Sequence, residues 1–104
     1  MADYFLVKNV AGPAWDHSRP RREQDGWDEH AAFMDCLAAE GVVVLGGPVG
    51  PGDGEYALLV VDAESEAAIR ARLADDPWAD EMLTIEIVEP WSVLLRGGTA
   101  VRPG

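Results

Sequence analysis

The chain has 104 residues, a length typical of a single domain. A domain of this size buries only about 60 to 70% of the surface that its unfolded chain exposes, so a partner subunit would add usefully to its core. The chain carries 8 Lys and Arg residues against 19 Asp and Glu residues, a formal net charge of −11. This charge repels phosphate groups, so neither nucleic acid nor an anionic membrane surface is an expected partner.

Cysteine usage and the N-terminal residues predict a cytoplasmic protein. Cys36 is the sole cysteine and cannot form a disulfide within the chain. The first ten residues hold an acid at Asp3 and a strand pattern, without the basic region or cleavage site of a signal peptide. No apolar run approaches the roughly eighteen residues of a membrane span. We therefore expect a reduced thiol and no membrane contact.

The first predicted strand runs from Tyr4 to Val10 and is followed by a Gly-Pro turn. Residues 11–24 come next and show no periodicity, and loops of this length in small domains are often functional. His17 in this loop is expected on the surface. Three arginines of the loop have two interpretations: solvated side chains, or a positive patch that receives an anionic group of a substrate. They are Arg19, Arg21 and Arg22.

A helix is predicted after Asp25, a suitable N-cap, and its end is predicted at Gly41, a glycine in the C′ position. Projected at about 100° per residue, its apolar residues form one stripe, and His30 lies inside that stripe. A titratable ring thus occupies a position expected for a core residue. It is either a core histidine with a satisfied hydrogen bond or an acid/base group. The stripe consists of Trp27, Ala31, Met34, Leu37, Ala38 and Gly41.

Two strands of continuous apolar character follow, at Val42 to Leu45 and at Tyr56 to Val61. We expect Gly46-Gly47-Pro48 to close the first of them. The segment between the two strands is rich in turn residues but lacks the spacing of a phosphate-binding loop. Because consecutive positions are apolar, both faces of these strands are expected to be covered.

A second helix is predicted at about Glu66 to Ala74, with Asp62 or Ser65 as its cap. Ile69 and Leu73 form its inward side. Pro77 follows shortly after, and proline disfavours helical conformation at the residue before it.

The last predicted strand runs from Thr84 to Leu95 and is interrupted at Pro90. Proline cannot donate a hydrogen bond to a neighbouring strand, so this is expected to be an edge or bulged strand. We expect one α+β domain over residues 1–96 and a flexible tail over residues 97–104.

The order strand, helix, strand, strand, helix, strand predicts the ferredoxin-like βαββαβ fold. In this α+β fold a four-stranded antiparallel sheet carries both helices on one face. The other face would be apolar over the second and third strands, which is more than a monomer normally exposes. We therefore expect a homodimer that packs one sheet face against the other.

Three segments carry motifs in a recognisable order: EHAAFMDCLAAEGVVVLGGPVG, ADDPW and IVEPWSVLL. Together they resemble the YciI family of YCII-related domain proteins, small members of the dimeric α/β-barrel superfamily. The resemblance spans about residues 4–95. It implies a ferredoxin-like protomer that dimerises as a dimeric α/β barrel. The long loop at residues 11–24 departs from the bacterial YciI proteins.

The resemblance also implies a His/Asp dyad in a pocket, at the positions of His30 and Asp76. Such a pair suits proton transfer, because the carboxylate orients the ring and stabilises its charged form. One activity described in the family removes hydrogen chloride from a chlorinated hydroxyquinol. Relatives in the superfamily isomerise lactones or oxidise polyketide phenols without a metal or a bound cofactor.

Candidate pocket residues flank these motifs. Trp27, Trp78 and Trp91 are candidates to wall an apolar pocket for a flat ring, although core packing is the commoner use of tryptophan. Gly47 and Pro48 either shape the end of their strand or allow close approach to a ligand. With two histidines, one cysteine and a loose acidic group at residues 75, 76 and 80, the chain is expected to bind no metal and to need no cofactor.

The sequence leaves three functional hypotheses open. In the first, the protein is a cofactor-independent lyase or isomerase of a small cyclic or aromatic molecule, with His30 as general acid/base and Asp76 as its orienting partner. In the second, a non-catalytic accessory protein holds a small ligand in the same pocket. In the third, the pair has a structural role only.

Overall fold

The computed structural model describes residues 4–52, 54–95 and 97 of the chain. Apart from Gly97, the predicted tail at 97–104 lies outside the described residues. The elements follow the predicted order, with one short 3-10 helix added in the long loop. They are β1 (Tyr4–Ala11), η1 (Arg21–Glu23), α1 (Trp27–Ala39), β2 (Val43–Val49), β3 (Tyr56–Val61), α2 (Glu66–Leu73) and β4 (Leu83–Trp91).

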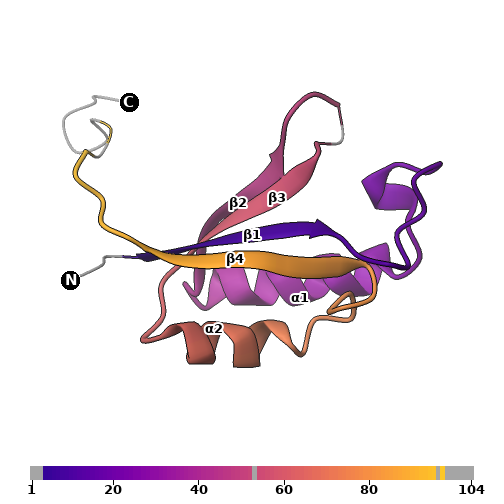
Figure 1. The fold of residues 1–104 in the computed structure, drawn as a ribbon. Helices are drawn as coiled ribbons and strands as arrows, with labels where there is room; N and C mark the ends of the chain where they lie inside the picture. The colour runs from indigo at the N-terminus through magenta and orange to yellow at the C-terminus, as the bar shows by residue number, and fades with distance from the viewer. Residues whose placement is uncertain (1–3, 53, 96, 98–104) are drawn as a thin grey trace.

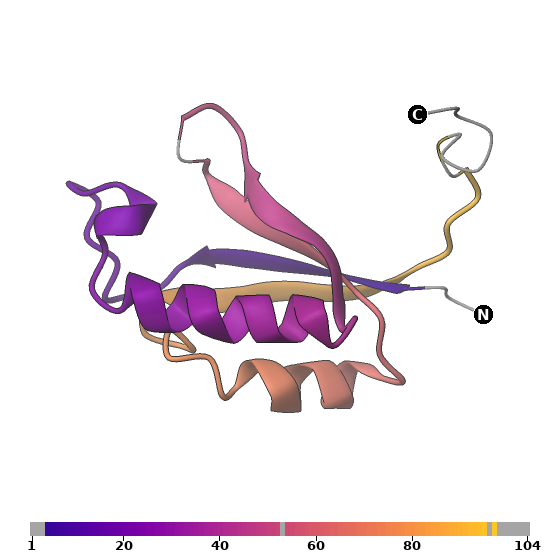
Figure 2. The same ribbon diagram turned by 180° about the vertical axis from the view of Figure 1, so that it is seen from behind.

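The four strands form one antiparallel sheet in the order β2-β3-β1-β4. Figures 1 and 2 show both helices on the same face of this sheet. No helix of the described residues covers the other face, which we call the open face. The predicted ferredoxin-like α+β fold is confirmed.

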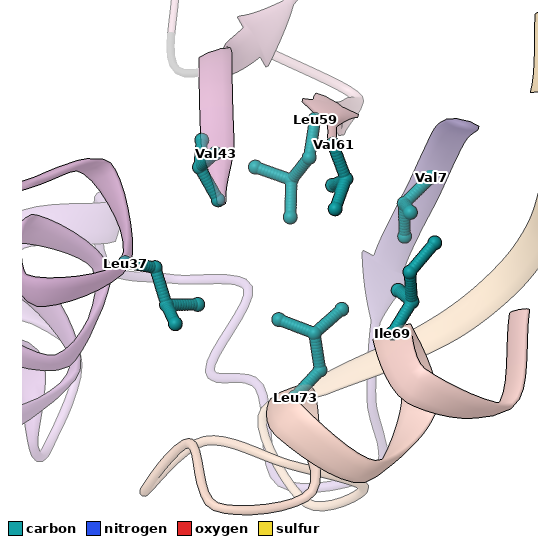
Figure 3. Packing of buried hydrophobic residues seen from close by; sticks show 7 residues of the cluster. All are labelled: Val7, Leu37, Val43, Leu59, Val61, Ile69 and Leu73. Atoms are coloured by element: carbon teal, nitrogen blue, oxygen red, sulfur yellow. The ribbon is translucent and has the colours of Figure 1, made fainter. Parts of the chain in front are cut away.

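An aliphatic core lies between the sheet and the helices (Figure 3). Side chains two positions apart in a strand point to the same face, so β1 and β3 contribute alternate residues. α2 contributes Ile69 and Leu73, the two residues predicted to face inward. The buried members of the core are Val7, Leu37, Val43, Leu59, Val61, Ile69 and Leu73.

The C-terminal end of α1 lies next to Gly41, as predicted from the sequence. Gly41 adopts the left-handed conformation, with φ 80°. Its N–H donates to the carbonyl of Ala38, and the N–H of Val42 donates to the carbonyl of Leu37, each over 3.0 Å. This is the Schellman pattern, in which a glycine turns the chain out of a helix. The helix can therefore lead directly into β2.

The N-terminal end of α1 differs from the prediction. Gly26, with φ 79°, is the N-cap in place of Asp25, and no side-chain cap is formed. The N–H of Trp27 instead donates to the backbone carbonyl of Gln24 over 3.2 Å. In α2 the cap is Ser65, one of the two predicted candidates, whose hydroxyl accepts the N–H of Ala68 over 3.1 Å.

β2 is longer than predicted. Gly46, Gly47 and Pro48 do not close the strand, because each pairs with a residue of β3 and the ladder continues to Val49. A Cβ at Gly46 would lie 2.7 Å from the Leu59 side chain, so the absence of a side chain permits the pairing. The cover expected for both faces of this strand is not present within one chain, since Leu45 is 68% exposed.

β4 is shorter than predicted. It passes through Pro90 but ends at Trp91 and does not extend to Leu95. Trp91 pairs with Tyr4, the first residue of β1, so the described part of the partner strand ends there. Leu94 and Leu95 are accordingly almost fully exposed.

Candidate functional site

α1 and the segment after α2 bring His30 and Asp76 together across 46 positions of sequence. Nδ1 of the ring lies 2.8 and 2.9 Å from the two carboxylate oxygens. The two side chains are 10% and 9% exposed. Because a carboxylate can only accept, Nδ1 of the neutral ring carries the proton and Nε2 is left as an acceptor. The arrangement thus prepares Nε2 to take a proton.

The backbone around Asp76 holds the carboxylate in place. Its N–H donates to the carbonyl of Leu73 at the end of α2, over 3.1 Å. Its Oδ1 accepts the N–H of Trp78 over 2.9 Å, in addition to its contact with His30. A carboxylate fixed at both its backbone and its oxygens gives the imidazole a single preferred orientation.

The indole of Trp78 lies flat against the ring of His30, with centroids 4.2 Å apart and planes 8° apart. Trp78 is 1% exposed, and its Nε1–H donates to the carbonyl of Asp25 over 2.8 Å. A Cβ at Gly26 would lie 3.1 Å from that nitrogen, so this turn passes very close to the indole. Trp78 therefore packs against one face of the His30 ring and helps to hold it in place.

Trp78 is also the centre of a second buried cluster, which we call the tryptophan cluster. Trp15 meets it edge-on, with centroids 5.6 Å apart and planes 83° apart, and Trp27 meets it at 5.7 Å and 53°. Edge-on and tilted contacts suit the charge distribution of aromatic rings. The cluster consists of Trp78, Met82 and Leu83, with Trp15 and Trp27 packed against them.

The long loop before α1 is held by the buried side chain of Gln24. Its Oε1 accepts the N–H of Asp16 over 3.0 Å, and its Nε2 donates to the carbonyls of Asp16 and Arg19 over 2.7 and 2.8 Å. Hydrogen bonds from the hydroxyl and N–H of Ser18, together with Arg19, lower the pKa of Asp16 to about 2. The loop therefore has a defined structure that delivers Trp15 to the tryptophan cluster.

The three arginines of this loop have separate roles. Arg19 pairs with Asp16 over 2.9 Å and with Asp25 over 3.4 Å. The guanidinium of Arg22 lies 5.7 Å from the ring centre of Trp27. Of the three, Arg21 is the one that lines the cavity described next, so the predicted positive patch reduces to a single side chain at the cavity.

A cavity of about 540 Å³ lies beside the dyad. His30, Trp27 and Met34 of α1 line it, together with residues of the sheet and of α2. Its size and mainly apolar lining suit a ligand of one or two rings. The residues of the sheet that line it include Asn9, Pro48, Ala57, Leu59 and Ile85.

The structure brings most of the predicted site residues together. Trp27, Gly47 and Pro48 line the cavity beside the dyad. Trp78 is buried behind His30. Trp91 lies at the end of β4, half exposed, and does not line the described cavity.

Asn9 is a cavity residue that the sequence reading missed. It is 8% exposed and lines the cavity from the sheet. The sequence does contain a signal for this residue. Asn9 continues the alternation of Phe5 and Val7 and is polar where the other two are apolar.

Among the described residues, no group of three or more His, Cys, Asp or Glu side chains gathers as a potential metal site. None of the described helices has the length and apolar character needed to cross a membrane. Cys36 is free and exposed.

Comparison with known proteins gives a family and a fold. A family model described as the YCII-related domain matches residues 7–92. The chain is similar in structure to 5-chloro-2-hydroxyhydroquinone dehydrochlorinase from Burkholderia phenoliruptrix, solved in complex with 2,5-dihydroxybenzoquinone. The TM-score is 0.57 at 24% sequence identity, over 86% of this chain and 93% of the other, a likeness that shows the fold alone. A search of curated proteins found no match.

Proposed function

Because the chain belongs to the YCII-related domain family, we propose that it is a cytoplasmic, cofactor-independent lyase or isomerase that acts on a small ring compound. His30 is the general acid/base, and Asp76 orients it. The observation that carries this proposal is the contact of Nδ1 with the Asp76 carboxylate at the wall of a 540 Å³ cavity. A proton-transfer pair is thus adjacent to a space of ligand size.

The chemistry follows from the orientation of the ring. Nε2 takes a proton from a hydroxyl or an acidic C–H group of the substrate, and the electron pair of that bond moves into a new double bond. In a lyase, the bond to a leaving group such as chloride breaks, and the electron pair of that bond departs with the leaving group. In an isomerase, the imidazolium returns the proton at another carbon. Asp76 stabilises the imidazolium between the two steps, a role that suits a carboxylate held at hydrogen-bond distance.

The cavity supports a flat, oxygenated ring as the substrate. Trp27 and the aliphatic side chains of the sheet offer apolar faces. The dehydrochlorinase with the same fold is solved with a benzoquinone, a flat ring that bears several oxygens. These features favour phenols, quinones and related cyclic compounds.

The test replaces His30 by alanine and measures turnover of 5-chloro-2-hydroxyhydroquinone, with chloride release as the readout, alongside a panel of small lactones. General acid–base catalysis is worth about 10² to 10⁴ in rate, so we expect a loss of this order in kcat/KM with the fold unchanged by circular dichroism. His17→Ala, which removes the other histidine of the chain, is the matched control. Binding without turnover would favour a ligand-binding accessory protein, and full activity in His30→Ala would refute the role of the dyad.

We also propose that the protein is a homodimer packed through the open face of the sheet. The large apolar side chains of Leu45 and Trp91 are exposed on this face or at its margin. Lys8 on this face pairs with Glu86 over 2.8 Å and lies 4.5 Å from the ring centre of Tyr56, so its charge is already compensated. A monomer over the whole micromolar range in sedimentation equilibrium would contradict the proposal.

A further inference from the structure

Asn9 is the polar exception on the face of β1 that points toward the helices. Val7, two positions before it, is fully buried in the aliphatic core, and Ala57 stands opposite Asn9 on β3. Asn9 is 8% exposed, yet no side-chain hydrogen bond among the described residues involves its carboxamide. The carboxamide atoms are not among the fully enclosed side-chain atoms that lack a partner in the described part of the chain, so the carboxamide keeps access to the cavity that Asn9 lines.

Asn9 reaches the cavity by the alternation of side chains along β1. In the pairing of β1 with β4, Lys8 stands opposite Ile87 and Asn9 opposite Ile85, so the extra residue of the bulge, Glu86, lies on β4. The bulge brings Ile85 opposite Asn9, and bulges occur frequently beside active sites. Asn9 lines the 540 Å³ cavity from the sheet, while His30 lines it from α1. A ligand in the cavity therefore has the base on one side and the carboxamide on the other.

We propose that Asn9 is a specificity-determining residue that binds a second oxygen of the substrate. This inference rests on the proposed function, because it takes His30 as the base. The substrate class is a ring that bears oxygens on two opposite sides. One oxygen faces Nε2 of His30, and the other accepts a hydrogen bond from the Asn9 carboxamide.

The second hydrogen bond has a chemical consequence. When Nε2 takes the proton of one hydroxyl, the O–H electron pair remains on that oxygen, no atom leaves, and the negative charge spreads over that oxygen and the ring carbons ortho and para to it. The opposite oxygen keeps its lone pairs, so the Asn9 N–H can donate to it before and after the proton transfer. This hydrogen bond fixes the orientation of the ring and keeps the reacting hydroxyl at Nε2.

The test compares hydroquinone with phenol, two rings that differ in the one oxygen assigned to Asn9. Dissociation constants are measured for the full chain by quenching of tryptophan fluorescence. We expect the wild type to bind hydroquinone about tenfold more tightly, as one net hydrogen bond allows. In Asn9→Leu, which has the same branched arrangement of heavy atoms and no hydrogen-bonding group, this preference should fall to about one. Asn9→Ala provides a second variant with the same expected loss.

The control is Ile85→Val, opposite Asn9 in the same cavity, which changes shape without changing hydrogen bonding. It should weaken both ligands by a similar factor and keep their ratio. A wild type without the preference, or an Asn9→Leu variant that keeps it, would overturn the inference. His30→Ala separates the two proposals: if it loses turnover while Asn9→Leu keeps the preference, the role of Asn9 fails and the proposed function stands. If His30→Ala keeps its turnover while Asn9→Leu loses the preference, Asn9 binds the second oxygen and the proposed role of His30 fails.

Discussion

The two buried clusters of this protein are held together by different forces. The aliphatic core between sheet and helices consists of side chains without polar atoms, and its stability comes from burial of apolar area, which has no preferred direction. The tryptophan cluster adds ring contacts of defined angle and the hydrogen bond from Trp78 to Asp25. The first cluster keeps the fold together, and the second fixes the orientation of His30.

This difference predicts that stability and site geometry can be changed separately. Replacing a side chain of the aliphatic core by a smaller one should lower the free energy of unfolding without moving the dyad. A substitution that displaces the Trp78 indole should move the surface against which the His30 ring packs.

The largest effect on stability is expected from Ile69→Ala in the aliphatic core. Ile69 is fully buried on α2, and such truncations lower the free energy of unfolding by about 2 to 5 kcal/mol. Arg72→Ala, on the exposed side of the same helix, removes a surface pair with Glu40 and should cost less than about 1 kcal/mol. Urea unfolding measures both variants. A dyad disturbed by Ile69→Ala, as seen in the His30 ring signals by NMR, would show that the clusters are coupled.

A smaller effect is expected from Gly26→Ala, for which the chain offers a matched control. Gly26 and Gly41 have the same left-handed φ, so alanine at either position should cost about 1 to 2 kcal/mol. At Gly41 the added Cβ meets nothing within 4 Å, whereas at Gly26 it lies 3.1 Å from Trp78 Nε1. We expect Gly26→Ala alone to weaken ring binding as well. Equal effects of the two substitutions on binding would show that the indole adapts.

The smallest effect is expected from Asp16→Asn in the loop that carries Trp15. The pKa of Asp16 is lowered from its ordinary value of 3.8 to about 2 by donors that prefer the charged form. Its contribution to stability is therefore fully present above about pH 4 and is lost as the pH falls toward 2. The difference in unfolding midpoint between wild type and Asp16→Asn should shrink over this interval. A constant difference would contradict the assignment.

Local signals in the sequence were sufficient for the fold. Apolar periodicity placed the elements, Gly41 marked the end of α1, and Ile69 and Leu73 showed which side of α2 faces inward. The errors arose where a distant neighbour decides the local structure. Gly26 serves as N-cap where Trp78, 52 positions away, leaves little room for a side chain. β2 continues through its glycines because β3 pairs with them.

The candidate site was only partly predictable for the same reason. His30 was marked by its place in an apolar stripe, but its contact with Asp76 depends on two distant segments, and only the family resemblance connected them. No pattern indicated that Trp78 would lie behind the ring while Trp91 lies at the far end of β4. Asn9, by contrast, follows a simple alternation along β1.

The two outer strands of the sheet each contain a proline, Pro48 in β2 and Pro90 in β4. A proline has no N–H to offer an incoming strand, and its ring obstructs close approach. Pairing along an edge would be open-ended, since each added chain presents a new edge to the next. When two chains pack through their open faces, both faces are covered and no further chain can be added there. The prolines therefore oppose pairing along either edge of the sheet and leave the open face as the surface for the proposed homodimer.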